Sequence, residues 1–386
     1  MKVDSVPRGE NMIIKNGKVF HEDGTFKTGD VAVSGELFAD LNETGLSGSD
    51  VLDAAGCYVI PGLIDIHFHG CAGYDFSGAN AKELVTMARF LAKNGTTAIC
   101  PATLTLPEDQ LAEACRRIAA LSDPEGAAVV GIHLEGPFFS HNKRGAQNPD
   151  HLQLPNIDMV RRLQKEAGGS IKLVAVAPEL DGAMSFIEEL SKEIRCSVAH
   201  TEANYETALE AFKRGARQVT HLYNAMPPLL HREPGVIGAA RDFPECSAEL
   251  ICDGVHVHPS AVRAAFAMFG ENRIIMISDS VMATGKADGI WDLGGLEIEV
   301  TGRCASLVST KTLAGSICTL MDCLRIAVTE MDIPLTSAVK CCTMNPAKSI
   351  GIFDRYGSIS PGKYADFVLL NEDLTVRGVY LRGTAL

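Results

Sequence analysis

The sequence predicts an α/β protein: a parallel (β/α)₈ barrel with a small β domain formed by both chain ends. Short apolar runs alternate with amphipathic stretches through the middle of the chain, and about eight such runs are present. Both ends instead show short strand-like segments separated by Gly, Asn and Asp turns. A chain of 386 residues is long enough for such a barrel and a small addition.

The order of elements follows from these patterns. Apolar runs predict strands at 63–69, 97–101, 129–134, 171–175, 198–200, 218–221, 249–251 and 274–278. Amphipathic stretches between them predict helices at 81–94, 107–122, 184–192, 204–214 and 259–269. We expect the β-like segments 12–60 and 357–382 to meet in one small domain.

Composition excludes several kinds of partner. A formal charge of −13 disfavours nucleic acid and anionic membrane surfaces, although one local basic pocket for a small anion stays compatible with it. No apolar run approaches the roughly 20 residues of a membrane span, and the N-terminus lacks the apolar core of a signal peptide. Twelve scattered cysteines without a C-x-x-C pair indicate reduced, mostly buried thiols, so we expect a cytoplasmic protein.

Polar residues recur where the predicted strands end, which is where barrels of this kind assemble their active sites. A lone histidine is more often a hydrogen-bonded or surface residue, but this recurrence favours one shared site. The residues are His67, His69, Glu135, His200, His221, His256 and Asp279.

His67 and His69 are two residues apart in PGLIDIHFHG, so in a strand they point to the same face and can share one metal ion. The alternative is a polar strand end that faces solvent. Glu135 ends another predicted strand, directly before a Gly-Pro turn, and the alternative role for Glu135 is a structural salt bridge. His133 lies deeper and reads as a residue that supports a ligand or as a core histidine.

Glu135, His200 and His221 together match a catalytic zinc-like site: one carboxylate, two imidazoles and an open position. Asp279 supplies a further carboxylate, with a role as general base and acid. The alternative is that Asp279 binds the metal itself or forms a hydrogen bond with a residue that binds it. Zn²⁺ is the first choice of metal, and Fe²⁺, Mn²⁺ and Co²⁺ accept the same ligand types.

These residues resemble the metal-dependent amidohydrolase superfamily and, within it, the N-acetylglucosamine-6-phosphate deacetylase family. The HxH pair alone indicates only the superfamily, whereas GxHLEGPF with HLxNAM and HREPG is far more specific. Matching segments follow the family's order over nearly the whole chain: PGLIDIHFHG, GIHLEGPFFS, RGAQNP, AHTEA, THLYNAMPPLLHREPG, DGVHVHP, SDSVMATG, STKTLAGS, NPAK and PGKYADFVLL.

The resemblance implies a barrel at 61–356 and a β-sandwich domain made of 1–60 plus 357–386. It implies hydrolysis of the N-acetyl group of N-acetyl-D-glucosamine 6-phosphate to glucosamine 6-phosphate and acetate, in amino-sugar catabolism. Glu135, His200 and His221 become the primary metal ligands and Asp279 the catalytic acid and base. Because the chain keeps His67 and His69, one or two ions per subunit are expected.

The resemblance also implies substrate contacts and a homodimer that can share phosphate contacts across its interface. The residues that correspond to contacts with the substrate and its phosphate are Asn224, the Ala225 backbone, Arg232 and His256, although Arg232 also fits a surface ion pair. The sugar contacts are Ala146, Leu313, Ala314 and Gly315. Gln147 stands where many relatives carry a histidine that polarises the acetyl carbonyl.

Two other functions stay open. A dihydroorotase-like or adenine-deaminase-like hydrolase shares the fold, but several of these use a carboxylated lysine where this chain offers Glu135. A non-catalytic scaffold barrel is the alternative from a different class. Such a scaffold is expected to have lost ligands, and this chain has lost none.

Overall fold

A curled sheet of parallel strands forms the centre of the computed structural model, which describes residues 11–42 and 50–386. Its strands are β6 (Leu63–Asp65), β9 (Thr96–Ile99), β10 (Ala128–Val129), β11 (Ile132–Leu134), β12 (Ile171–Val176), β13 (Arg195–Val198), β14 (Gln218–Val219), β15 (Ser247–Ile251) and β16 (Ile274–Ile277). Neighbours in this order pair in parallel, and a parallel bridge between Ala102 and His133 joins the two sheet segments. The Asp279 N–H donates to the His67 carbonyl at 2.9 Å, so the end of the last strand meets the end of the first.

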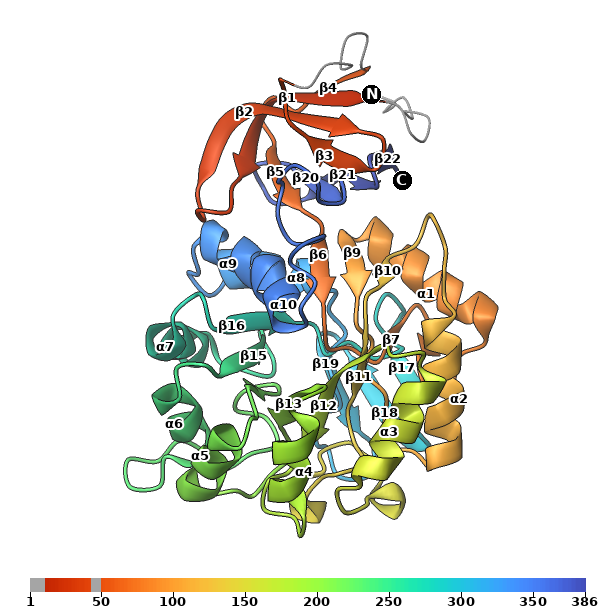
Figure 1. Ribbon diagram of the computed structural model, residues 1–386, viewed down its shortest axis with the longest axis vertical. Coiled ribbons are helices and arrows are strands. Elements are labelled where there is room, and N and C mark those ends of the chain that lie inside the picture. The colour runs from red at the N-terminus through yellow and green to blue at the C-terminus, as the bar shows by residue number, and fades with distance from the viewer. Residues whose placement is uncertain (1–10, 43–49) are drawn as a thin grey trace.

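Helices cover the outside of this sheet (Figure 1). They are α1 (Ala81–Lys93), α2 (Glu108–Ala119), α3 (Ile157–Glu166), α4 (Ala183–Leu190), α5 (Tyr205–Lys213), α6 (Gly235–Asp242), α7 (Pro259–Phe269), α8 (Leu320–Thr329), α9 (Leu335–Cys342) and α10 (Met344–Ser349). Helix α1 shows why they form: Asn80 and Glu83 make a capping box, and an apolar face that includes Leu84 and Leu91 is buried. Helices α3, α6 and α8 to α10 were not among the predicted elements.

Both chain ends contribute strands to one further sheet. Its strands are β1 (Met12–Phe20), β2 (Phe26–Ser34), β3 (Leu37–Ala39), β4 (Asp50–Asp53), β5 (Tyr58–Pro61), β20 (Phe367–Leu370), β21 (Val376–Leu381) and β22 (Thr384–Ala385). Strand β5 pairs with β20, which joins the two ends, and the sheet packs a hydrophobic cluster of its own around Met12, Val33 and Phe367. This sheet lies beyond the N-terminal end of β6, at the top of Figure 1. Residues 1–10 and 43–49 of the predicted 1–60 segment lie outside the described residues.

An antiparallel sheet that was not predicted follows β16. It consists of β17 (Gly289–Leu293), β18 (Leu296–Thr301) and β19 (Cys304–Leu307), and a two-residue pair, β7 (Gly70–Cys71) and β8 (Tyr74–Asp75), lies after β6. Leu293 and Leu307 of the antiparallel sheet pack with Val281 and Ala314 in one buried cluster. The sheet is therefore anchored beside the C-terminal end of β16.

Within the described ranges, no helix has the length and apolarity needed to cross a membrane.

Candidate metal centre and substrate cavity

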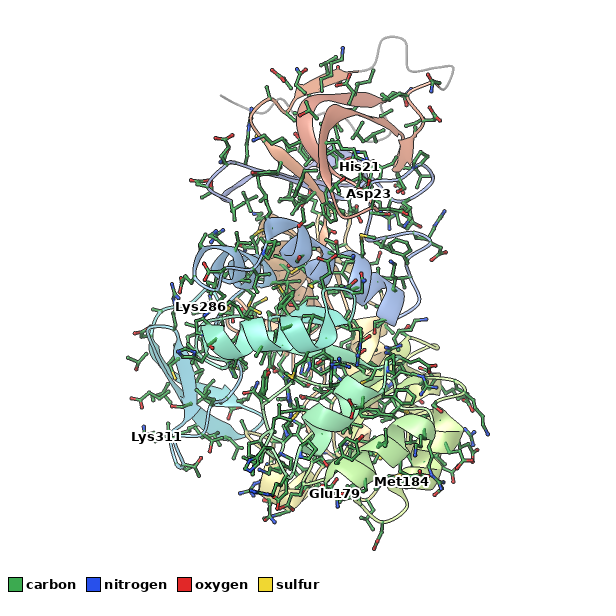
Figure 2. The ribbon with its side chains drawn as sticks, turned by 90° about the vertical axis from the view of Figure 1, so that its left-hand side faces the viewer. His21, Asp23, Glu179, Met184, Lys286 and Lys311 are labelled. Carbon is green, nitrogen blue, oxygen red and sulfur yellow. The ribbon has the colours of Figure 1, made fainter. Side chains whose placement is uncertain are left out.

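The residues predicted at strand ends come together at the C-terminal end of the parallel sheet, and all are buried except His256, which is half-buried. His200, His221 and Asp279 each lie two residues beyond their strands, with φ of 45°, 32° and 48°. Non-glycine residues seldom adopt this left-handed conformation, and it persists where the surrounding structure holds it, often at functional sites. Glu179 binds the backbone N–H of Glu202 and the Thr201 hydroxyl, and thereby holds the segment after His200. Figure 2 shows Glu179 at the end of the molecule far from the terminal sheet, whose turn between β1 and β2 carries the labelled His21 and Asp23.

The first group of possible ligands is Glu135, His200 and His221. The Oε1 atom of Glu135 lies 3.3 Å from Nε2 of His200 and 3.4 Å from Nε2 of His221, and the two Nε2 atoms are 3.0 Å apart. Nδ1 of His200 is 2.8 Å from the Lys143 carbonyl, an acceptor that places the ring hydrogen on Nδ1. The Nε2 lone pair of His200 is therefore directed at its neighbours in this group.

The second group is His67, His69 and Asp279. Glu135 of the first group also contacts the histidines of the second group. Nε2 of His67 is 3.2 Å from Oε1 of Glu135, and Nε2 of His69 is 3.1 Å from Oε2. Oδ1 of Asp279 is 3.7 Å from Nε2 of His67 and 3.5 Å from Nε2 of His69. In each group the possible ligand atoms lie within 4.8 Å of one another.

The electrostatics of these groups fit a cation. Burial lowers the pKa of His67, but the charges of Glu135 and Glu249 outweigh it and hold the pKa well above its usual value. Burial also lowers the pKa of His69, but Asp279 and Glu135 raise it to about 10. Nε2 of His67 has no hydrogen-bond partner among the described residues, although Glu135 is near. A nearby cation stabilises the negative charge of buried carboxylates. Carboxylate oxygens together with imidazole nitrogens are ligands that suit a divalent ion of the Zn²⁺, Fe²⁺, Mn²⁺ or Co²⁺ type.

A cavity of about 650 Å³ opens above both groups. His69, Glu135, His200, His221 and Asp279 contribute to its lining, as do Leu293, Leu296 and Leu307 of the unpredicted antiparallel sheet. Seven of the predicted substrate residues also line it: Ala146, Gln147, Asn224, Ala225, His256, Leu313 and Gly315. Most of the predicted site therefore faces a single space.

Three predicted residues do not line this cavity. His67 is fully buried beneath it, and Ala314 is buried in the cluster that anchors the antiparallel sheet. Arg232 lies outside, exposed, with its Nη1 2.6 Å from Nε2 of His231 and with the exposed side chains of Leu229 and Leu230 nearby in sequence. Arg232 is therefore not among the residues that line this cavity.

The side chain of Gln147 is held by two hydrogen bonds. Its Oε1 accepts from the Thr105 N–H at 2.8 Å, and its Nε2 donates to Oε2 of Glu135 at 2.9 Å. One of the two amide hydrogens is therefore directed at Glu135. Gly136 follows Glu135 because an added Cβ there would lie 2.2 Å from Oγ1 of Thr105.

Basic side chains also line the cavity. Nδ1 of His256 is 2.7 Å from Oδ2 of Asp253, and although burial lowers the pKa of His256, this carboxylate raises it above the usual value. Lys143 and Arg144 line the same space. Sequence reasoning missed both, although two adjacent basic residues directly before the Gly-Ala-Gln segment were a signal.

A curled parallel sheet with imidazoles and carboxylates gathered at the carboxyl ends of its strands is the arrangement of a metal-dependent hydrolase. Residues 58–386 match the Amidohydrolase family, and the chain belongs to this family.

Relatives with known names cover nearly the whole chain. The chain is 38% identical to N-acetylglucosamine-6-phosphate deacetylase of Bacillus subtilis (strain 168), over 97% of this chain and 93% of that protein. It is 32% identical to the Homo sapiens protein of the same name, over 96% of this chain and 93% of that one. Among solved structures, a mutant N-acetyl-D-glucosamine-6-phosphate deacetylase from Mycobacterium smegmatis, in complex with N-acetyl-D-glucosamine-6-phosphate, has a TM-score of 0.90 at 30% identity, covering 98% of this chain and 99% of that chain. The Thermotoga maritima deacetylase has a TM-score of 0.86 at 28% identity, covering 97% and 99%.

Proposed function

We propose that this protein hydrolyses the N-acetyl group of N-acetyl-D-glucosamine 6-phosphate to glucosamine 6-phosphate and acetate, in amino-sugar catabolism. The observation that carries the proposal is the convergence of two possible ligand groups on Glu135 beneath one cavity of about 650 Å³. Named relatives along nearly the full chain support the choice of substrate.

Glu135, His200 and His221 would hold the primary divalent ion, with Zn²⁺ as the first choice. His67 and His69, with Asp279 and Glu135, would hold a second ion. A bound divalent ion lowers the pKa of a bound water toward ~7 and polarises a carbonyl oxygen.

Asp279 is the group that moves protons in this proposal. Its carboxylate takes a proton from the attacking water and returns it to the amide nitrogen, which leaves as an amine. Its backbone is fixed by the 2.9 Å hydrogen bond to the His67 carbonyl and by the 2.7 Å hydrogen bond that its own carbonyl accepts from Ser316. Gln147 has a second amide hydrogen available for the acetyl carbonyl.

The phosphate would bind at the cationic part of the cavity wall. His256 faces the cavity with Asp253 behind it, and the Ala225 backbone can add an N–H donor, whereas the Asn224 N–H already donates to the His221 carbonyl at 2.9 Å. Because Arg232 is exposed outside its own cavity, we place it against the phosphate bound by a second copy in a homodimer. Ala146, Leu313 and Gly315 would then contact the sugar, with Ala314 packed behind them.

The finer organisation is proposed on the same basis. The curled sheet and its helices make a (β/α)₈ barrel at 61–356, and the terminal strands make a β-sandwich domain from 1–60 plus 357–386. All twelve cysteines are free thiols, which supports the cytoplasm as the place where the enzyme acts.

The test measures bound metal and acetate release on the same purified protein. We expect at least one tightly held divalent ion and acetate from N-acetylglucosamine 6-phosphate, and we expect Asp279→Asn to remove turnover. Dihydroorotate and adenine serve as the competing substrates. Metal-replete protein that releases no acetate, or an Asp279→Asn variant as active as the parent, would contradict the proposal.

A further inference from the structure

Glu249 is a buried carboxylate on β15 that the proposed reaction does not use. Its Oε2 lies 2.8 Å from Nδ1 of His67, and both side chains are fully buried. The opposite ring nitrogen, Nε2 of His67, faces Glu135 at 3.2 Å. We propose that Glu249 is a positioning residue that prepares His67 to bind the second metal ion, an inference that rests on the metal roles proposed above.

The carboxylate of Glu249 is itself held in place by Gln218. Nε2 of Gln218 donates to Oε1 of Glu249 at 2.5 Å. Oε1 of Gln218 in turn accepts from Nε of Arg195 at 2.9 Å and from the Ser349 hydroxyl at 2.6 Å. Two donors thus hold the oxygen of Gln218, so its NH₂ group must face Glu249.

The ring of His67 is held on another side as well. His133 packs edge-on against it, with ring centroids 4.6 Å apart and an interplanar angle of 79°. Oε2 of Glu249 also accepts the backbone N–H of His221 at 3.3 Å. Glu249 contacts a ring nitrogen of His67, a proposed ligand of the second ion. It contacts only the backbone of His221, a proposed ligand of the first ion, and not the His221 ring. Binding of the second ion therefore depends on Glu249 more than binding of the first ion does.

The physical reason is the position of the ring hydrogen. Imidazole can offer the Nε2 lone pair to a metal only when its hydrogen is on Nδ1, and a carboxylate that accepts from Nδ1–H fixes this form and makes Nε2 more basic. Loss of such a partner typically costs about 10- to 100-fold in metal affinity. Glu249 therefore decides whether His67 is a competent ligand.

Glu249→Gln tests this with almost no change of volume. Because Gln218 can present only its NH₂ group, the new amide must turn its oxygen toward Gln218 and its own NH₂ toward His67. Two donors then face each other unless the ring hydrogen moves to Nε2, which removes the lone pair needed by the metal. We expect Zn²⁺ or Co²⁺ titration to show the second ion bound about 10- to 100-fold more weakly, and the first ion weakened less, because His221 loses only a 3.3 Å acceptor of its backbone N–H.

Two comparisons separate positioning from general stabilisation. Asp253→Asn is the matched control, because Asp253 makes the same carboxylate contact to Nδ1 of His256 at 2.7 Å, and His256 is not a proposed metal ligand. It should keep the parental affinity for both ions. In a His67→Ala background, Glu249→Gln should cause no further loss of metal affinity, because its target is already gone.

Several results would overturn the inference. One is a Glu249→Gln variant that binds the second ion with the affinity of the parent, and another is a parent protein that binds only one ion. A third is a Glu249→Gln variant in which the affinities for both ions fall equally and the unfolding temperature, measured with chelator present, is lower than that of the parent. None of these measurements uses acetate release, so they fail or succeed independently of the proposed substrate.

Discussion

Gly315→Ala should slow the reaction by displacing Asp279. Gly315 has a φ of +66°, and a Cβ added there would lie 2.8 Å from the Asp279 carbonyl oxygen and 2.5 Å from Cγ1 of Val281. The adjacent Ser316 N–H donates to the same Asp279 carbonyl at 2.7 Å. The new methyl group can be accommodated only if the backbone that carries Asp279 moves.

Two costs add in this variant. A non-glycine residue in the left-handed conformation costs about 1 kcal/mol relative to glycine. The forced contact adds about 1–3 kcal/mol, as for other overpacked sites. A displacement of the order of 1 Å at a reacting group can reduce kcat about 100-fold, which is the effect we expect.

The assay is kcat for acetate release with metal content measured on the same sample. Gly302→Ala is the matched control, because Gly302 has a φ of +60° but no atom within 4 Å of an added Cβ. It should carry the backbone cost alone and keep its kcat. Equal kcat values for the two alanine variants would refute the argument that Gly315 sets the position of Asp279.

Three further outcomes are expected. Arg232→Ala should lower kcat/KM for the 6-phosphate substrate about 10- to 100-fold and leave activity on the unphosphorylated sugar much less changed, whereas equal losses on both would indicate a structural role. If Arg232 serves the neighbouring cavity, mixing Arg232→Ala and Asp279→Asn subunits should restore about one quarter of the parental rate, and no recovery would place Arg232 in its own subunit's site. Burial raises the pKa of Asp366 from 3.8 to about 6, so the folded state keeps a proton that the unfolded chain releases, and the free energy of unfolding falls as the pH rises from about 4 to 6. Over that pH range the Asp366→Asn variant should gain about 3 kcal/mol of unfolding free energy relative to the parent, measured by denaturant titration with chelator present. If the variant shows no such gain, Asp366 ionises normally.

The parallel strands and the histidines and carboxylates that gather at their ends could be predicted from the sequence because one physical pattern marks both. A buried parallel strand reads as an apolar run, so a polar residue at its end stands out, as His200 and Asp279 do. Glu249 was less visible because it lies inside such a run. A carboxylate there is costly unless it has partners, and that was the available signal.

Other features depend on packing that local sequence does not encode. The segment GIWDLGGLEIEV contains a hairpin signal, two alternating runs around Gly-Gly, but nothing in it shows that Leu293 and Leu296 would line the cavity. Leu313 and Ala314 are adjacent in one motif, yet only the first faces the cavity. The exposed position of Arg232 depends on the conformation of its loop, which the sequence motif does not determine. The motif also does not indicate whether Arg232 would contact a ligand bound to its own chain or to a second copy.

The pairing of β5 with β20 has a consequence for synthesis of the chain. Pro61 pairs with Phe367, so about 300 residues must be made before β5 meets its partner. At about 5–20 residues per second, the edge of β5 waits roughly 15–60 s after leaving the ribosome. During that time it is an open strand edge that other chains can pair with. The parallel sheet and its helices can begin to fold earlier, but the terminal sheet closes only when translation is nearly finished, so a chain that stops before β20 would keep this edge exposed.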